Sequence, residues 1–243
     1  MRILFWNIQH GGGKRIGQIV QTVTQHNPDL IAFAEYRVAP GRKLVEALGK
    51  GGWNYVESTE PADRENGLCI LSRVPVRRMA VQAPPENAVR WICLDLPDHG
   101  LRIGVLHIPC AGRSVVAKKR FWDAVIANAK QVQHEPFLFL GDLNTGLHRI
   151  DEVGKTFACT EQFRQMTELG WTDTWRAFNP GSTEFTWYSK FRGGKRGNGF
   201  RVDHAFAAPS LLPRVRGCRY SHLERDSGAS DHALLIVEIE TAA

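Results

Sequence analysis

The chain has 243 residues, of which 43% are hydrophobic and 23% are charged, a balance that excludes intrinsic disorder and allows a substantial buried core. Its apolar runs are all shorter than the ~20 residues that a membrane-spanning helix needs, so we expect no membrane segment. The formal net charge of +6 favours a polyanionic partner, because bound lysine and arginine release counterions from a phosphate backbone. A mildly basic surface without such a partner gives the same charge.

In chain order, apolar runs bounded by turn residues predict strands at 3–6, 30–34, 67–71, 90–96, 103–108, 137–140, 202–207 and 233–239. Helical periodicity predicts helices at 15–26, 42–48, 115–133 and 161–169. Beyond the strand–helix–strand start, strands and helices do not alternate strictly. We therefore predict an α/β fold of the α+β type, a four-layer sandwich of two packed mixed or antiparallel sheets flanked by helices, in one domain spanning 1–243.

The cysteines indicate a cytoplasmic protein. They are odd in number, scattered and without a CxxC pair: Cys69, Cys93, Cys110, Cys159 and Cys218. Polar Asn7 closes the first strand before an apolar signal segment could form. We expect a soluble cytoplasmic protein with reduced thiols, and a monomer by default.

Polar side chains end or precede several of the predicted strands. They are Asn7, Glu35, His107, Asp142, Asn144, Asp231 and His232. Singly, such residues are more often turn formers or helix caps than functional groups. Jointly, carboxylate and amide oxygens at strand ends are the hard ligands that Mg²⁺ prefers, so their shared occurrence predicts a metal-dependent site.

The same residues lie in ordered motifs that resemble a known family. Trp6-Asn7-Ile8, Ala34-Glu35, GLCILS at 67–72, GDLN at 141–144, RVDH at 201–204 and SDH at 230–232 are similar, in order and strand context, to those of the endonuclease/exonuclease/phosphatase superfamily. That superfamily includes exonuclease III-like AP endonucleases, to which the likeness is greatest, as well as deoxyribonuclease I, sphingomyelinases and inositol-phosphate phosphatases. The resemblance implies phosphodiester hydrolysis with Mg²⁺, for which Mn²⁺ could substitute.

The resemblance also implies a role for each motif residue in the metal site. Glu35 resembles the metal-binding carboxylate, and Asn7 and Asp231 complete or support that site. A divalent cation offsets the charge of a phosphodiester and lowers the pKa of bound water. The implied metal ligands are therefore Asn7, Glu35 and Asp231.

The implied catalytic residues are Asp142, Asn144, Asp203, His232 and His107. Asp142 resembles the residue that orients or deprotonates the attacking water, and Asn144 its neighbour that positions the phosphate. His232 and Asp203 resemble a pair in which the carboxylate fixes the imidazole that contacts the scissile phosphate. His107 stands where AP endonucleases carry a tyrosine, which is more like deoxyribonuclease I and the sphingomyelinases and weakens an assignment to abasic sites.

Four residues are predicted to bind substrate. Trp187 resembles an aromatic residue that lines a deoxyribose pocket in the exonuclease III branch, although a core position is equally consistent with the sequence. Arg90 matches an arginine behind the active site, while Lys118 and Arg201 belong to basic clusters suited to backbone phosphates or to a solvated face. A further basic, glycine-rich stretch covers 190–201.

These features predict a Mg²⁺-dependent DNA phosphodiesterase. It would be either an AP endonuclease with 3′-exonuclease activity or a less specific endonuclease, acting on double-stranded DNA. The alternative is a phosphoesterase for a phospholipid head group or a sugar or inositol phosphate, which His107 leaves open. A nucleic-acid-binding module that lost its chemistry would have a broken carboxylate set, whereas this set is intact.

Overall fold

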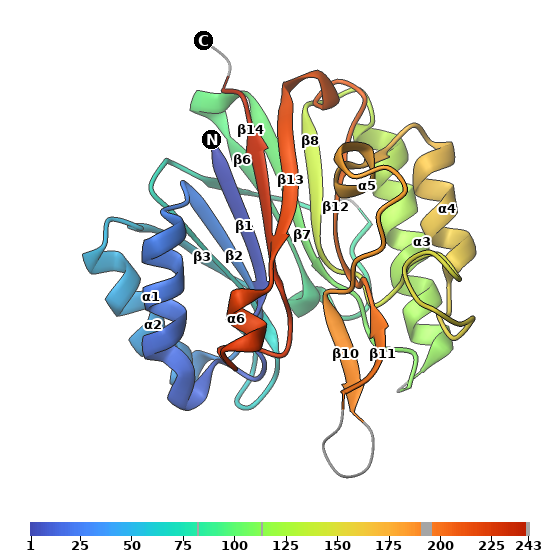
Figure 1. Cartoon of the computed structure of the whole chain (residues 1–243). Helices are drawn as coiled ribbons and strands as arrows, with labels where there is room; N and C mark the ends of the chain where they lie inside the picture. The colour runs from blue at the N-terminus through green and yellow to red at the C-terminus, as the bar shows by residue number, and fades with distance from the viewer. Residues whose placement is uncertain (82, 113, 191–195, 242–243) are drawn as a thin grey trace.

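Two packed β-sheets form the centre of the protein. The computed structural model describes residues 1–81, 83–112, 114–190 and 196–241. Two six-stranded sheets lie face to face, with helices α1 and α2 outside one sheet and α3 and α4 outside the other (Figure 1). This arrangement confirms the predicted four-layer α/β sandwich.

The first sheet holds both ends of the folded chain. Its strand order is β13-β14-β1-β2-β4-β3, with β1 (Arg2–Asn7), β2 (Leu30–Tyr36), β3 (Tyr55–Ser58), β4 (Gly67–Ser72), β13 (Val215–Ser221) and β14 (Leu234–Ile239). β1 and β2 are parallel and the other neighbours are antiparallel. Helix α1 (Ile16–His26) connects the parallel pair and α2 (Val38–Lys50) follows β2.

The second sheet is also built around one parallel pair. Its order is β5-β6-β7-β8-β12-β9, with β5 (Arg77–Met79), β6 (Trp91–Leu96), β7 (Leu101–His107), β8 (Phe137–Asp142), β9 (Thr172–Asp173) and β12 (Asp203–Ala207). β7 and β8 are parallel and are connected by α3 (Val115–Val132), against which α4 (Thr160–Glu168) packs. Within the described ranges, none of the helices combines the length and apolar character needed to cross a bilayer.

The remaining elements are short. A separate hairpin of β10 (Trp187–Lys190) and β11 (Arg196–Phe200) extends away from the sheets in Figure 1. Helix α5 (Thr174–Phe178) follows β9, and α6 (Leu223–Asp226) lies between β13 and β14. Single 3₁₀ turns cover Gly13–Arg15, Ala88–Arg90, Pro97–His99 and Leu212–Arg214. Residues 191–195 of the predicted basic stretch lie outside the described residues.

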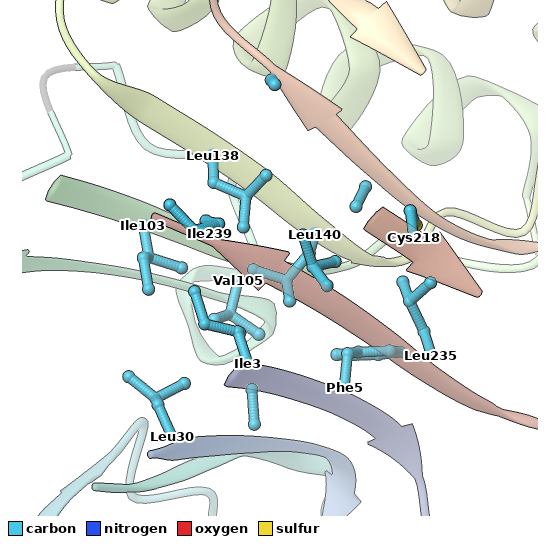
Figure 2. Close-up of a cluster of buried hydrophobic side chains, with 14 of the residues drawn as sticks. Ile3, Phe5, Leu30, Ile103, Val105, Leu138, Leu140, Cys218, Leu235 and Ile239 are labelled. Carbon is cyan, nitrogen blue, oxygen red and sulfur yellow. The ribbon is translucent and has the colours of Figure 1, made fainter. Parts of the chain in front are cut away.

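Successive side chains along each strand point to opposite faces of its sheet. They form three apolar layers, one between the sheets and one beneath the helices on each outer face. Ile3 and Phe5 of β1 point between the sheets, where they meet Val105 and Leu140 of the second sheet (Figure 2). The intervening side chains of β1 pack beneath the outer helices, because successive strand residues face opposite sides. Strands covered on both faces have continuous apolar sequences, which is why these runs were easy to identify. Burial of each such side chain stabilises the folded state by about 1.5–3 kcal/mol relative to leaving it exposed.

The predicted strands and helices are all present, with shifts at their ends. β6 begins at Trp91, because Arg90 belongs to a 3₁₀ turn. Helix α2 begins at Val38 and not at Arg42; Pro40 lies in its first turn, where proline loses no helical hydrogen bond. The sequence did not reveal β13, which has seven residues but an irregular register, or the shorter elements β3, β5, β9, β10, β11, α5 and α6.

A buried ion-pair network holds β9 and the segment before β12 to the loop after β8. The Arg201 guanidinium is 1% exposed, donates through Nε to Asp151 at 2.8 Å and through Nη2 to Asp173 at 2.6 Å, and lies over the Trp175 ring. Burial alone would raise the pKa of the Asp173 carboxyl, but Arg201 holds it well below its usual range. These internal carboxylates occupy the Arg201 guanidinium, and its predicted contact with substrate stays a prediction.

Replacing Arg201 with alanine should strongly destabilise the fold. We expect Arg201→Ala to lower the free energy of unfolding by about 3–5 kcal/mol at pH 7, because two buried carboxylates lose their partner. Urea denaturation measures this difference. The pKa of Asp173 is depressed in the folded protein, so the ion pair with Arg201 stabilises the fold fully at pH values above the ordinary carboxyl pKa of 3.8. As the pH falls below 3.8, the difference in unfolding free energy between wild type and Arg201→Ala should narrow.

Arg219→Ala is the matched control, because Arg219 pairs with Glu238 at an exposed position. Surface ion pairs contribute about 0–1 kcal/mol, so this variant should unfold almost like the wild type. Equal losses in the two variants would contradict the assigned role of the buried network.

Candidate active site

The predicted site residues gather where the two parallel strand pairs end. Asn7 and Asp142 are the last residues of β1 and β8, His107 is the last of β7, and Glu35 is next to last in β2. Carboxyl ends of parallel strands meet at one edge of a sheet, and here the two sheets bring their edges together. A cavity of about 500 Å³ opens there, lined by Gln9, His10, Glu35, Asn66, Arg90, His107, Pro109, Cys110, Ala111, Gly112, Lys118, Asp142, Asn144, Thr156, Phe157, Ala158, Trp187, Phe200, Val202, Asp231 and His232.

The Asp142 carboxylate lies at the bottom of this cavity. It is opposite His107 and Asp203 in the strand register. Its Oδ2 accepts a hydrogen bond from Asn7 Nδ2 at 3.0 Å, and its Oδ1 accepts one from the Asn144 backbone N–H at 3.0 Å. Burial, with the negative charge of Asp203, raises the pKa of Asp142 to about 7 against the opposing effect of His232. This carboxyl can therefore exchange a proton near neutral pH.

His232 and Asp203 form a buried pair beside Asp142. His232 Nδ1 lies 2.9 Å from Asp203 Oδ2, and the Trp187 ring flanks the imidazole with 6.4 Å between centroids. Burial alone would lower the pKa of His232, but the Asp203 carboxylate outweighs it and raises this pKa to about 10. The imidazole is thus a cation near pH 7 whose orientation Asp203 fixes.

The donor set fits a hard divalent cation. Ligand atoms of Asp142, Asp203 and His232 lie within 4.8 Å of one another. At neutral pH the two carboxylates offer oxygen ligands, whereas the protonated imidazole has no lone pair to offer. Asp203 Oδ1 is buried and has no hydrogen-bond partner within the part of the chain that is described. Glu35 adds a third carboxylate at the cavity wall. Carboxylate oxygens of this kind are the protein ligands that Mg²⁺ and Mn²⁺ take.

Asn7 and Asp231 make protein contacts at this site. The Asn7 amide donates to Asp142 and accepts from the Gln9 backbone N–H at 3.0 Å, so it orients Asp142. Asp231 Oδ2 accepts from Gln9 Nε2 at 3.1 Å and from Trp187 Nε1 at 3.2 Å. Their predicted role as metal ligands stays a prediction, as does that of Glu35.

A constrained loop brings His10 to Glu35. Residues 9–13 all have positive φ, as does Glu35 itself, a backbone conformation that costs energy outside glycine and concentrates at functional sites. A Cβ on Gly12 would lie 2.6 Å from the Ile19 side chain. The His10 backbone N–H donates to Glu35 Oε2 at 2.9 Å, and Arg15 holds the loop by donating to its carbonyls.

Three of the four predicted substrate-binding residues line the cavity. Trp187 forms part of its wall, and Arg90 lines it while donating to the His107 carbonyl at 3.3 Å. Lys118 also lines it, although it is buried; its ammonium donates to the Asn144 carbonyl, and burial lowers the pKa of Lys118. Arg201 is not among the lining residues, for the reason given above.

Sequence reasoning missed several lining residues. Gln9 and His10 lie two and three residues after Asn7, a position that could have identified them. Phe200 is next to last in the basic, glycine-rich stretch, and Phe157 lies in a loop without any motif. No local pattern reveals the aromatic residues, because contacts between distant segments bring them to the cavity.

Comparison with protein families agrees with this geometry. Residues 4–232, which include all of the gathered strand ends, match the endonuclease/exonuclease/phosphatase family. The chain belongs to the endonuclease/exonuclease/phosphatase family. It is accordingly a hydrolase, and its buried Asp142, Asp203 and His232 are consistent with a metal site in such an enzyme.

Curated relatives of this family member are distant. A DNA-(apurinic or apyrimidinic site) endonuclease of Dictyostelium discoideum is 23% identical over 235 residues, covering 89% of this chain but only 64% of the relative. The DNA repair nuclease APEX1 of Danio rerio is 23% identical over 256 residues, covering 96% of this chain and 80% of the relative. This chain thus spans less than two thirds of the length of the Dictyostelium protein.

Solved structures share the fold over almost the whole chain. An AP endonuclease from Archaeoglobus fulgidus superposes with a TM-score of 0.84 at 18% identity, covering 99% of this chain and all of that one. The 3′ phosphatase NExo from Neisseria, bound to a product DNA hairpin, gives 0.82 at 22% identity, covering 99% of both chains. The 3′-5′ exonuclease NExo of Neisseria meningitidis superposes with a TM-score of 0.79 at 23% identity, covering 99% of this chain and all of that one.

The protonation of His232 should depend on Asp203. We expect the His232 imidazole of the wild type, kept in EDTA, to titrate near pH 10. In Asp203→Asn the pKa of His232 should fall by two units or more. An opposite charge within hydrogen-bond distance commonly shifts a pKa by ~1–3 units, and without Asp203 the burial of His232 would disfavour its charged form with less opposition. Nuclear magnetic resonance of the imidazole nitrogens against pH gives both midpoints.

The control is Asp98→Asn, which removes an exposed carboxylate from a 3₁₀ turn outside the cavity. It should leave the His232 midpoint unchanged. A midpoint that is the same in Asp203→Asn as in the wild type would show that Asp203 does not set the charge of this imidazole.

Proposed function

We propose that this protein is a Mg²⁺-dependent DNA phosphodiesterase that hydrolyses the backbone of double-stranded DNA, as an exonuclease III-like AP endonuclease with 3′-exonuclease activity or as a less specific endonuclease. The observation that carries the proposal is the buried group of Asp142, Asp203 and His232 at the bottom of a cavity with an aromatic wall. The charges in this group match the proton transfers of phosphodiester hydrolysis.

In this proposal Asp142 and His232 have different catalytic roles. Asp142, whose pKa is about 7, orients a water molecule and accepts its proton as the water attacks phosphorus. The P–O bond to the leaving sugar oxygen breaks at the same time, and that oxygen takes up a proton from solvent water. His232, protonated near neutral pH, donates to a nonbridging phosphate oxygen, where negative charge grows. Glu35 and Asp231, which line the cavity and are predicted metal ligands, would hold a divalent cation that would supply further charge neutralisation and lower the pKa of the attacking water. Asn7 and Asp203 hold the two acid/base groups in place.

The cavity wall supports a nucleic-acid substrate. Trp187 and Phe200 lie next to each other with ring centroids 5.8 Å apart, and both line the cavity. Aromatic faces of this kind stack on bases and sugars. Lys190 and Arg196, on the hairpin that carries these two rings at its base, are exposed and suited to backbone phosphates.

The similar proteins support the same substrate. The names of the Dictyostelium and Danio relatives refer to apurinic or apyrimidinic sites and to DNA repair. The Neisseria 3′ phosphatase, which shares the fold, was solved with product DNA. We extend DNA as the substrate to this chain on these likenesses together with the aromatic wall and the basic hairpin.

Mg²⁺-dependent cleavage should require Asp142. We expect the wild type to cleave supercoiled plasmid or a duplex with an abasic site, EDTA to abolish cleavage, and Mg²⁺ or Mn²⁺ to restore it. Asp142→Asn should lower turnover by roughly two to four orders of magnitude, because the amide cannot accept the proton of the water. Gel electrophoresis of the products over time measures the rates.

The small phosphodiester bis(p-nitrophenyl) phosphate distinguishes the alternative class of substrate. Hydrolysis of this compound by an enzyme that leaves both DNA substrates intact would replace the DNA assignment with a phospholipid or sugar phosphate. Near-normal DNA cleavage by Asp142→Asn would instead remove the proposed mechanism.

DNA affinity should fall steeply with salt. If lysine and arginine side chains neutralise backbone phosphates, each neutralised phosphate makes log K decrease by about 0.9 for every tenfold rise in salt, because counterions are released. We expect a slope of roughly −3 or steeper for binding of the Asp142→Asn protein to duplex DNA, measured by fluorescence anisotropy. A flat response would indicate recognition of a small substrate.

A further inference from the structure

Three aromatic rings continue one another along the cavity wall towards His232. Trp187 flanks the His232 imidazole, and Phe200 follows Trp187 with 5.8 Å between ring centroids. Phe157 then meets Phe200 edge to face, with centroids 5.4 Å apart and an interplanar angle of 72°. Trp187 and Phe200 come from the base of the hairpin, whereas Phe157 comes from the loop between β8 and α4. Phe157 therefore needs an anchor of its own.

That anchor is the Glu152 carboxylate. It is buried, with its side chain 1% exposed, and it accepts the backbone N–H of Thr156 at 2.8 Å and that of Phe157 at 3.0 Å. The Thr156 hydroxyl also donates to it, and His148 Nδ1 lies 2.7 Å away. The backbone of Glu152 bridges to Phe200. One residue thus binds the loop of Phe157 and the strand of Phe200.

The Glu152 carboxylate holds the loop through charge-assisted hydrogen bonds and not only through packing. Burial of the carboxylate alone would raise the pKa of Glu152, but the hydrogen bonds from Phe157, Thr156 and His148 lower it. An ionised carboxylate that accepts two successive backbone N–H groups fixes the direction of both peptide units. The neighbouring Val153 and Lys155 side chains are exposed, so at this part of the loop the carboxylate, and not apolar packing of these side chains, fixes the backbone.

We propose that Phe157 is a specificity-determining residue that contacts the sugar or base of the nucleotide at the scissile phosphate, and that Glu152 is the positioning residue that holds its ring in the cavity wall. This inference rests on the proposed DNA phosphodiesterase function. It assigns to the loop between β8 and α4 a part in substrate recognition. Phe157 extends the aromatic surface of Trp187 and Phe200 away from His232, so its contact affects binding while proton transfer at Asp142 and His232 is unchanged.

Steady-state kinetics on the DNA substrate that the wild type cleaves fastest tests the proposal. Phe157→Ala should raise KM about tenfold, in line with the loss of one aromatic contact to a nucleotide, and leave kcat within about threefold. Glu152→Gln should raise KM in the same direction by a smaller factor, because an amide accepts the two backbone N–H groups less strongly. The double variant Glu152→Gln/Phe157→Ala should match Phe157→Ala alone, because Glu152 acts through that ring.

Phe178→Ala is the matched control, since Phe178 is an exposed phenylalanine in α5 and not among the lining residues. It should leave both constants unchanged. An unchanged KM in Phe157→Ala, a fall in kcat at constant KM, or multiplied effects in the double variant would each overturn the proposal while leaving the DNA phosphodiesterase intact. A wild type that cleaves no DNA would overturn both.

Discussion

The hydrogen bond between Asn7 and Asp142 joins the two sheets at the candidate active site. Asn7 ends the parallel pair of one sheet and Asp142 ends that of the other. Either pair alone would present a polar residue to solvent, where Asp142 would be an ordinary surface carboxylate. Packing of the sheets, through the apolar surfaces between them (Figure 2), buries Asp142, which lies opposite Asp203 in its own sheet. Burial and the Asp203 charge raise the pKa of Asp142 to about 7, while Asn7 of the other sheet and His232 oppose this rise.

The central strands and the polar residues at their ends can be predicted from the sequence, because these strands are buried on both faces. Continuous apolar runs identify β1, β2, β7 and β8, and a polar residue that closes such a run must lie at the edge of a sheet. Asn7, Glu35, His107 and Asp142 were found in this way. The sequence pattern does not say which sheet edges meet, and only the likeness of the ordered motifs to a known family joined them into one site.

Residues whose partners are remote in sequence could not be predicted. Arg201 lies two positions from Asp203, and this proximity together with its charge favoured a phosphate contact. Its guanidinium instead turns to Asp151 and Asp173, which no spacing rule connects to it. Phe157 and Glu152 escaped notice for the same reason, since an isolated phenylalanine and an isolated glutamate in a loop carry no periodic signal. Local patterns report burial, whereas pairing of charges depends on the completed fold.

The placement of β14 has a consequence for biosynthesis. This strand begins two residues after His232 and pairs with β1. Residues far apart in the sequence are therefore neighbours in the middle of one sheet. Contacts between such remote segments form late, because a long loop must close before they contribute stability. A nascent polypeptide that has not yet released β14 from the ribosome holds Asn7, Glu35 and Asp142 but lacks its imidazolium. The order of synthesis therefore leaves the candidate site incomplete until this strand has been translated.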